Sequence, residues 1–264
     1  MFRYATSVYG QDQLLGASWD LIWWFAGAAA AYILADAAFR FFLVRKPKLA
    51  LAQDGARVVR HKGVDRLYHW LMAACVLTLI ITSFAPILDW KFQWVTAHWI
   101  SGALLSALVL AHIIRATLFQ DVWAMIITPA DFSITWQNIR KTFGGLTGEA
   151  RKPGKFTLMQ KAYHLAVGGL VLILAATGLT MFAKIDTTLW QRNPYILDAE
   201  TWGYIYALHG LGAMALLAIV AVHIYFGVRP DKWFVNRSMF TGDMARRDYL
   251  AHHDEQRWKP EPKA

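Results

Sequence analysis

Cysteine is almost absent from this sequence. Cys75 is the only cysteine among 264 residues, so no Cys-x-x-Cys motif occurs. This excludes an iron–sulfur cluster, a cysteine-ligated zinc site and haem attached covalently through a Cys-x-x-Cys-His motif. Any iron–sulfur relay that serves this chain must therefore belong to another subunit.

The beginning of the chain lacks the features of a signal peptide. Residues 1–16 have neither a basic start nor a short apolar core, so we expect the first long apolar segment to remain in the mature chain. The sequence also shows no soluble domain and no internal repeat.

Charged residues are scarce, at 17% of the chain, whereas hydrophobic residues make up 56% and the mean hydropathy is +0.30. An ordinary soluble domain is less apolar than this. The apolar residues form segments of membrane-spanning length, which we place at 17–44, 67–88, 95–119, 158–183 and 202–228. Tryptophan and tyrosine gather near the segment ends, as they do at membrane interfaces. We predict an all-α integral membrane protein, with a four-helix bundle and one extra N-terminal transmembrane helix.

Basic residues predict the orientation in the membrane. They are concentrated after the first and third segments: Arg45, Lys46, Lys48, Arg57, Arg60, Lys62, Arg66, Arg140, Lys141, Arg151, Lys152 and Lys155. The other two connections carry few basic residues and several acids, including Asp89 and Asp186. The positive-inside rule then predicts a periplasmic N-terminus and a cytoplasmic C-terminus in a bacterial inner membrane. The net charge of +9 reflects this topology and lipid contact, and we expect no nucleic-acid partner.

Three parts follow from this pattern: an N-terminal helix with a basic loop (1–60), the bundle (61–228) and a polar tail (229–264).

Residues 131–143 carry apolar side chains largely on one face, which predicts a helix lying along the membrane surface. The tail is long enough to dock but has no evident core, so its His252 and His253 are expected to be solvated or lipid-facing. In the first helix, Asp36 is expected to face another helix or Arg40, four residues on.

Two histidines fourteen residues apart, His209 and His223, lie in an apolar segment in which almost nothing else is polar. In a helix, fourteen residues rise about 21 Å and return to nearly the same face. Imidazole is costly in hydrocarbon, so the pair indicates ligands, partners or a proton path rather than two hydrogen-bonded core histidines. The separation suits two b-type haems, one near each side of a membrane core about 30 Å thick.

Four more histidines lie in or beside the apolar segments: His69, His98, His112 and His164. In the predicted topology His98 and His209 share the periplasmic level and form one pair. At the cytoplasmic level His223 can pair with either His69 or His112. His112 is itself fourteen residues from His98, so spacing leaves this choice open.

Several motifs occur in a fixed order along the chain: residues 64–70 (VDRLYHW), 98–102 (HWISG), 154–161 (GKFTLMQK) and 238–258, with the His209/His223 segment between the last two. Together they closely resemble the cytochrome b, or gamma, subunit of respiratory formate dehydrogenase, a dihaem membrane cytochrome b. The resemblance covers roughly residues 60–258, and the first helix is additional. It implies a four-helix bundle that binds two b haems.

The resemblance also implies the haem ligands, with His69 paired with His223 and His98 paired with His209. Two neutral imidazoles close the iron to oxygen and suit it to electron transfer. At the cytoplasmic ends of their segments, Arg66 and Arg115 are candidates for pairing with haem propionates, although either is equally suited to anchor the chain at the membrane surface.

A quinone site, for ubiquinone or menaquinone, is a further implication of the resemblance. It would lie near the cytoplasmic haem, with Thr157, Gln160, Tyr163 and His164 as candidates. Residues 157–159 replace an Asn-Ala-Gly usual in the family, whereas Gln160 matches. For His112 and His164 three interpretations stay open: a third haem, proton relay beside the quinone, or structural hydrogen bonds.

The sequence therefore predicts an electron-transfer subunit rather than an enzyme complete in itself. An iron–sulfur subunit, connected to a molybdenum or tungsten subunit that oxidises formate, would supply electrons that pass through both haems to the quinone. Cytochromes of nickel–iron hydrogenases, and of thiosulfate or polysulfide reductases with reversed flow, share this architecture. A histidine-lined transporter is the alternative of another class, but the chain lacks proline-broken segments in matching halves. A structural anchor without a cofactor is a third possibility.

Overall fold

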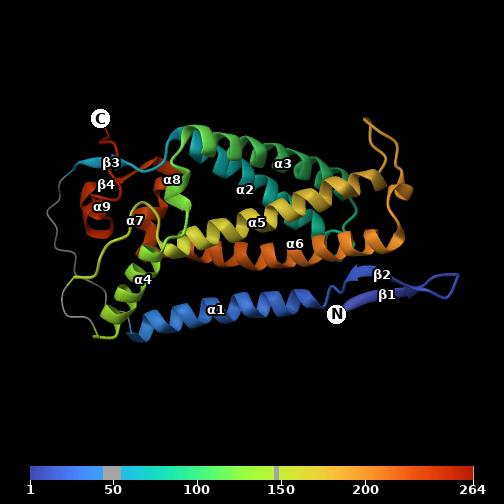
Figure 1. The fold of residues 1–264 in the computed structure, drawn as a ribbon, viewed down its shortest axis with the longest axis horizontal. Helices are drawn as coiled ribbons and strands as arrows, with labels where there is room; N and C mark the ends of the chain where they lie inside the picture. The colour runs from blue at the N-terminus through green and yellow to red at the C-terminus, as the bar shows by residue number, and fades with distance from the viewer. Residues whose placement is uncertain (44–54, 146–148, 264) are drawn as a thin grey trace. The chain divides into compact units, whose positions relative to one another are not determined.

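Five long apolar helices dominate the described part of the chain. A computed structural model describes residues 1–43, 55–145 and 149–263. The long helices are α1 (Leu21–Leu43), α2 (Gly63–Phe84), α3 (Trp94–Phe119), α5 (Leu158–Met181) and α6 (Ala199–Val228) (Figure 1). Each is long and apolar enough to cross a membrane, which confirms the predicted all-α membrane fold. The predicted basic residues Arg45, Lys46 and Lys48 lie outside the described residues.

The second helix begins and ends four residues earlier than the predicted segment 67–88. Its end at Phe84 precedes the Ala85-Pro86 pair. A proline disfavours helical geometry at the residue before it and has no N–H to continue the ladder, so the helix stops there. At the other end Asp65 lies in the first turn, where a negative charge is favourable.

The chain forms two compact units, each assembled from three separate stretches. Unit 1 comprises Met1–Ala31, Trp70–Ile113 and Val167–Val222, and unit 2 comprises Tyr32–His69, Ile114–Ala166 and His223–Ala264.

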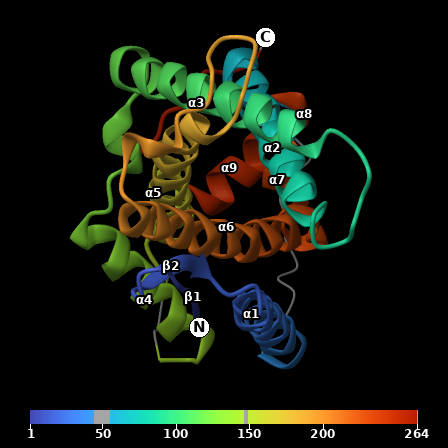
Figure 2. The same cartoon turned by 90° about the vertical axis from the view of Figure 1, so that its right-hand side faces the viewer.

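Unit 1 contains a four-helix core. One buried residue from each helix meets at its centre: Cys75 of α2, Leu105 of α3, Val171 of α5 and Leu216 of α6. Figure 2 shows these four helices obliquely, with the right-hand side of Figure 1 facing the viewer. The single cysteine is thus a small apolar side chain of this core.

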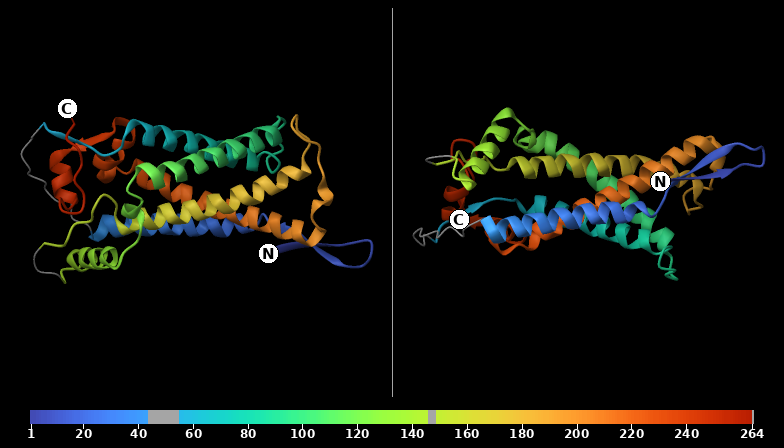
Figure 3. Two further views of the ribbon diagram at one scale, coloured as in Figure 1. Left: turned by 45° about the horizontal axis from the view of Figure 1, so that its top comes forward. Right: turned by 90° about the horizontal axis from the view of Figure 1, so that it is seen from below.

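An antiparallel hairpin, β1 (Phe2–Thr6) and β2 (Asp12–Ala17), also belongs to unit 1 and was not predicted (Figure 3). Residues 17–20, predicted as helix, form the end of β2 and the turn before α1. The hairpin approaches the start of α6 so closely that a Cβ atom at Gly203 would overlap the Leu14 carbonyl oxygen. Glycine at this position therefore permits the hairpin to pack on the helix.

Unit 2 contains a small cap built largely from the tail. Strand β3 (Arg57–Val59) pairs with β4 (Asp243–Ala245), beside the short helices α7 (Trp233–Asn236), α8 (Ser238–Thr241) and α9 (Arg246–His252). Val58, Met244 and Tyr249 are buried together, with Trp258 packed against them. The expectation that the tail has no core is therefore wrong, because β3 supplies the strand that closes it.

The surface helix predicted at residues 131–143 forms as α4 (Pro129–Thr142). Ile134 is buried, whereas Phe132, Trp136 and Phe143 are largely exposed, so Ile134 does not share the apolar face formed by the other three. Its position at a membrane surface stays a prediction.

Candidate functional site

Two pairs of histidines face each other across neighbouring helices. In unit 1 the ring centres of His98 (α3) and His209 (α6) are 6.4 Å apart, with 64° between the ring planes. In unit 2 the ring centres of His69 (α2) and His223 (α6) are 6.3 Å apart, with 51° between the planes. The structure thus brings together the same two pairs that the sequence resemblance implies.

These separations suit one metal ion between each pair of rings. A histidine nitrogen lies about 2 Å from a first-row metal that it binds, and the ring centre about 1 Å further away, so two rings on opposite sides of one iron have centres about 6 Å apart. Across residues 1–43, 55–145 and 149–263, no group of three or more His, Cys, Asp or Glu side chains could hold a metal. A metal ion held between two histidines must therefore take its other ligands from a group that is not part of the protein.

Buried threonines hold both rings of the His98–His209 pair. Thr82 Oγ1 lies 2.8 Å from His98 Nδ1, and Thr177 Oγ1 lies 2.8 Å from His209 Nδ1. Neither threonine was a candidate from the sequence, because Thr in an apolar helix commonly bonds only to its own backbone. Their helical positions relative to the histidines become visible only once the helices are packed.

The His69–His223 pair has different surroundings. The Tyr163 ring stacks on His223, with ring centres 4.8 Å apart and planes 14° apart. Of the other quinone-site candidates, Thr157 and Gln160 cap the start of α5. The Thr157 N–H donates to Gln160 Oε1 at 3.0 Å, and the Gln160 N–H donates to Thr157 Oγ1 at 3.3 Å.

The remaining candidates are placed as follows. Arg115 donates to Asp65 Oδ1 through Nε and Nη2, at 3.2 and 2.9 Å, while Arg66 donates to the Phe240 carbonyl. Their pairing with propionates stays a prediction. His112 lies in the α3 stretch of unit 1 and His164 in the α5 stretch of unit 2, and all three interpretations of this pair stay predictions.

An ionic cluster joins α1 to the end of α6 in unit 2. Asp36 Oδ2 accepts hydrogen bonds from Arg40, Arg229 and the Tyr225 hydroxyl, each at 2.9 Å. This confirms that Asp36 faces both Arg40 and another helix. Arg229 also pairs with Asp231, and these carboxylates outweigh the effect of burial, so the pKa of Arg229 lies above its ordinary value.

One of the two tail histidines, His253, is buried rather than solvated as expected. His253 is 5% exposed, its Nδ1 lies 2.7 Å from the Gly154 carbonyl, and its Nε2 lies 3.2 Å from Arg60 Nη1. Because arginine only donates, Nε2 accepts and Nδ1 carries the hydrogen. Burial lowers the pKa of His253 to about 4.

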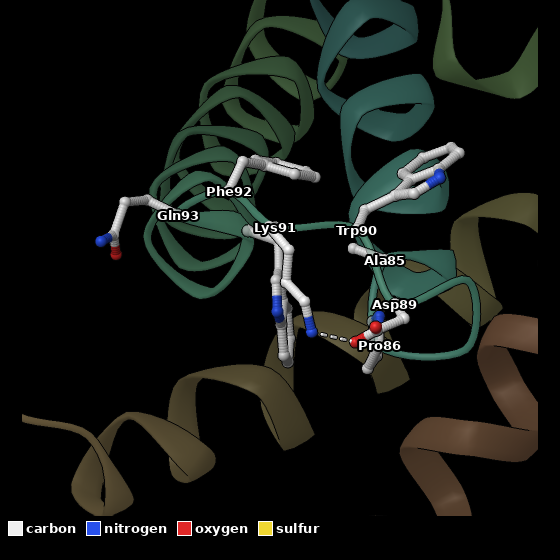
Figure 4. Close-up of a pocket in the computed structure, with 8 residues that line it drawn as sticks. Ala85, Pro86, Asp89, Trp90, Lys91, Phe92 and Gln93 are labelled. Atoms are coloured by element: carbon white, nitrogen blue, oxygen red, sulfur yellow. Dashed lines mark hydrogen bonds and ion pairs between the residues drawn. The ribbon is translucent and has the colours of Figure 1, made fainter.

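A surface pocket lies in the loop between α2 and α3. Its lining consists of Ala85, Pro86, Asp89, Trp90, Lys91, Phe92, Gln93 and Trp94 (Figure 4). The charged pair in it, Asp89 and Lys91, is largely exposed. Since none of the candidate histidines lines this pocket, it offers no ligand set comparable with the two pairs.

Comparison with known proteins decides which metal group fits. The sequence profile of the prokaryotic cytochrome b561 family matches residues 60–242. The chain belongs to this family. The cytochrome b556(Fdn) subunit of the nitrate-inducible formate dehydrogenase of Escherichia coli K12 is 24% identical over 76% of this chain and 89% of its own length. A probable Ni/Fe-hydrogenase B-type cytochrome subunit of Rhizobium leguminosarum bv. viciae is also 24% identical, over 76% of this chain and 96% of its own length.

The family implies b-type haem, and the histidine pairs fit that group. A haem supplies its iron with four nitrogens from the macrocycle, so the protein needs to add only two axial ligands. Pairs of histidines are therefore sufficient for this group, without clusters of three or four ligands. In each pair α6 provides one imidazole, and α2 or α3 provides the other. The ring centres are 6.3 and 6.4 Å apart, which suits one iron between the two rings.

Proposed function

We propose that this cytochrome is the membrane-anchoring subunit of a respiratory oxidoreductase and carries two b haems. His98 and His209 would hold one, and His69 and His223 the other. The observation that carries the proposal is the presence of two facing pairs with ring centres 6.3 and 6.4 Å apart. When bound, two bis-histidine haems supply one-electron transfer without an open position for oxygen.

The placement of the two sites along the chain supports a route for the electrons. His209 and His223 both lie in α6, fourteen residues apart, so a single helix contributes to both sites. The basic connections support a periplasmic level for the His98–His209 site and a cytoplasmic level for the His69–His223 site. Electrons would enter at the first site from an iron–sulfur subunit and leave at the second to a quinone, beside Tyr163 and His164.

Formate is the proposed ultimate donor, oxidised by a molybdenum or tungsten subunit. The support is the set of shared motifs around the histidines, together with the formate dehydrogenase relatives. Hydrogen is the second candidate donor, because the hydrogenase cytochrome is equally similar and is matched over a larger share of its length.

The test is a reduced-minus-oxidised absorbance spectrum of the purified chain, with haem counted per polypeptide. Two b haems are expected. A count of three would make His112 and His164 ligands as well, and would overturn the two-haem proposal. A colourless protein would contradict it altogether and favour a transporter or a bare anchor.

The donor is tested on the intact complex purified from its natural membrane. Under the proposal, formate reduces the haems in the absence of hydrogen. Reduction by hydrogen alone would instead assign the chain to a hydrogenase, while leaving its haem ligation unaffected.

A further inference from the structure

We infer that Thr82 and Thr177 are positioning residues that hold the two ligands of the His98–His209 haem in one tautomer and thereby lower its reduction potential. This inference rests on the proposed haem ligation. It concerns residues that do not touch the iron, and it distinguishes one haem site from the other.

The direction of the hydrogen bonds follows from the hydroxyl groups. A threonine hydroxyl has one hydrogen to donate and can also accept. Thr82 Oγ1 lies 2.7 Å from the Thr78 carbonyl oxygen, and Thr177 Oγ1 lies 2.7 Å from the Ile173 carbonyl oxygen. With its hydrogen committed to its own helix, each hydroxyl accepts from the histidine 2.8 Å away.

The histidine tautomer follows from this direction. Nδ1 of His98 and of His209 must carry the hydrogen that the threonine accepts, so Nε2 keeps its lone pair. A neutral imidazole with a free Nε2 lone pair is the form that binds a metal. Hydroxyl orientation and metal ligation therefore require the same tautomer at both rings.

Burial makes these bonds effective. Thr82 is 2% exposed and Thr177 is 8% exposed, so water does not compete for the hydroxyls. Beside Thr177, Gly178 has no side chain, and a Cβ atom there would lie 3.4 Å from His209 Cε1. This is the short end of ordinary van der Waals distance, so α5 lies close to the His209 ring at this point.

The two threonines form a matched arrangement around one site. The ligands come from α3 and α6, whereas the threonines come from the other two bundle helices, α2 and α5. At the second site His223 instead has the flat face of Tyr163 against it. The environments of the two sites are thus chemically different.

A hydrogen bond from Nδ1–H to an acceptor makes the imidazole a more basic ligand. A more basic ligand stabilises the ferric state over the ferrous state, which lowers the reduction potential. Removing either hydroxyl should therefore raise the potential of this haem and leave the other unchanged.

The experiment is a spectroscopic redox titration of the purified holoprotein carrying Thr82→Val, Thr177→Val or both. Valine matches the shape of threonine without the hydroxyl. Each single variant should change the reduction equilibrium of one haem about tenfold, which is about 59 mV for a one-electron couple, and the double variant should show the larger shift. Thr82→Ser and Thr177→Ser, which keep the hydroxyl, should restore the original potential.

Matched controls lie on the same two helices. Thr78 and Thr180 each donate to the carbonyl four residues earlier at 2.9 Å and are not bonded to the ligand histidines. Thr78→Val and Thr180→Val should leave both potentials unchanged.

Several outcomes would overturn the inference. Valine variants that bind both haems with unchanged reduction potentials would overturn it. Serine variants whose reduction potentials shift as far as those of the valine variants would also overturn it. Loss of only this haem in a valine variant, with recovery in the serine variant, would support the positioning role. If the unmodified chain bound no haem at these histidines, the proposed function itself would fail, and that result is read before any variant is made.

Discussion

The carboxylate of Asp36 in α1 accepts a hydrogen bond from the Arg229 guanidinium just beyond α6, with 2.9 Å between Oδ2 and Nη1. The Arg229 side chain is 6% exposed and that of Asp36 is 18% exposed. The family match begins at residue 60, so Asp36 connects a helix outside the match to one inside it. The extra helix is therefore held by this ion pair, together with the contact between the Tyr32 and Phe226 rings, whose centres are 6.2 Å apart.

Replacing Asp36 by Asn should loosen this helix without loss of haem. Asn keeps an oxygen for the Tyr225 hydroxyl but removes the charge that pairs with Arg229, at a cost of about 1–3 kcal/mol. Thermal unfolding of the solubilised protein measures the loss. Asp20→Asn is the control, because Asp20 is exposed and its side chain accepts a hydrogen bond from nearby Ser18. Equal effects of the two changes would contradict a specific role for Asp36.

Alanine substitutions test the ligand pairs. His98→Ala and His209→Ala should each remove the same haem, because either change leaves its iron with one protein ligand. His69→Ala should remove the other haem, and His112→Ala should spare both. Haem content and the reduced spectrum of each variant measure this. Loss of the second haem in His112→Ala, with retention in His69→Ala, would favour the alternative in which α3 and α6 hold both haems.

That His98 and His209 lie at one level of the helices could be predicted from the sequence, because the lengths and alternating directions of the helices determine which positions lie side by side. That reasoning paired His98 with His209, whereas His69 required the resemblance, since His112 lies at the same level. Thr82 and Thr177 could not be predicted from spacing. Their contacts depend on how the helices rotate about their axes, and the apolar residues surrounding them leave that rotation undefined.

The small strands were missed for a different physical reason. The β3–β4 ladder joins Val58 to Met244, which are 186 residues apart in the sequence, and three-residue strands carry too little periodicity to be recognised. The strands of the hairpin that begins at Phe2 lie largely at the surface, so an alternating buried face does not mark them. A turn signal was present at Gly10, which adopts a φ of 77°.

A buried ion pair, Lys161–Asp131, should decide whether α4 stays docked on α5. Lys161 Nζ lies 2.9 Å from Asp131 Oδ2, and the side chains are 9% and 5% exposed. Burial alone would raise the pKa of Asp131, but hydrogen bonds from Lys161 and Thr128 outweigh it, so the pKa lies below its ordinary value. Lys161→Met leaves this carboxylate unpaired and should cost about 3–5 kcal/mol in thermal unfolding.

The double variant Lys161→Met/Asp131→Asn should recover most of that loss. Asn removes the buried charge and keeps an oxygen for the Thr128 N–H, which caps the helix. Lys91→Met is the control, because Lys91 and Asp89 form an exposed pair of little energetic value. A double variant no more stable than Lys161→Met would show that the pair is not what holds α4.

Acid should release the tail through His253. Its pKa is lowered to about 4 in the folded chain, against about 6.5 when unfolded, because it is buried beside Arg60. The free energy that neutral, buried His253 contributes to the docked tail is fully present above about pH 6.5. It falls by about 3 kcal/mol in total as the pH drops toward 4, because only the unfolded tail takes up the proton freely. Hydrogen exchange of residues 242–258, corrected for intrinsic rate, should therefore accelerate between pH 7 and 4.5.

The variant His253→Gln separates this titration from others in the tail. Glutamine cannot take up a proton, so the exchange of the variant should depend less on pH than that of the unmodified chain. The pKa of His252 is also lowered by burial, and its contribution remains in the variant. Asp243 does not contribute in this window, because hydrogen bonds from Lys263 and Arg57 outweigh burial and hold its pKa below the ordinary value. An identical pH profile in both proteins would show that His253 does not control the docking of the tail.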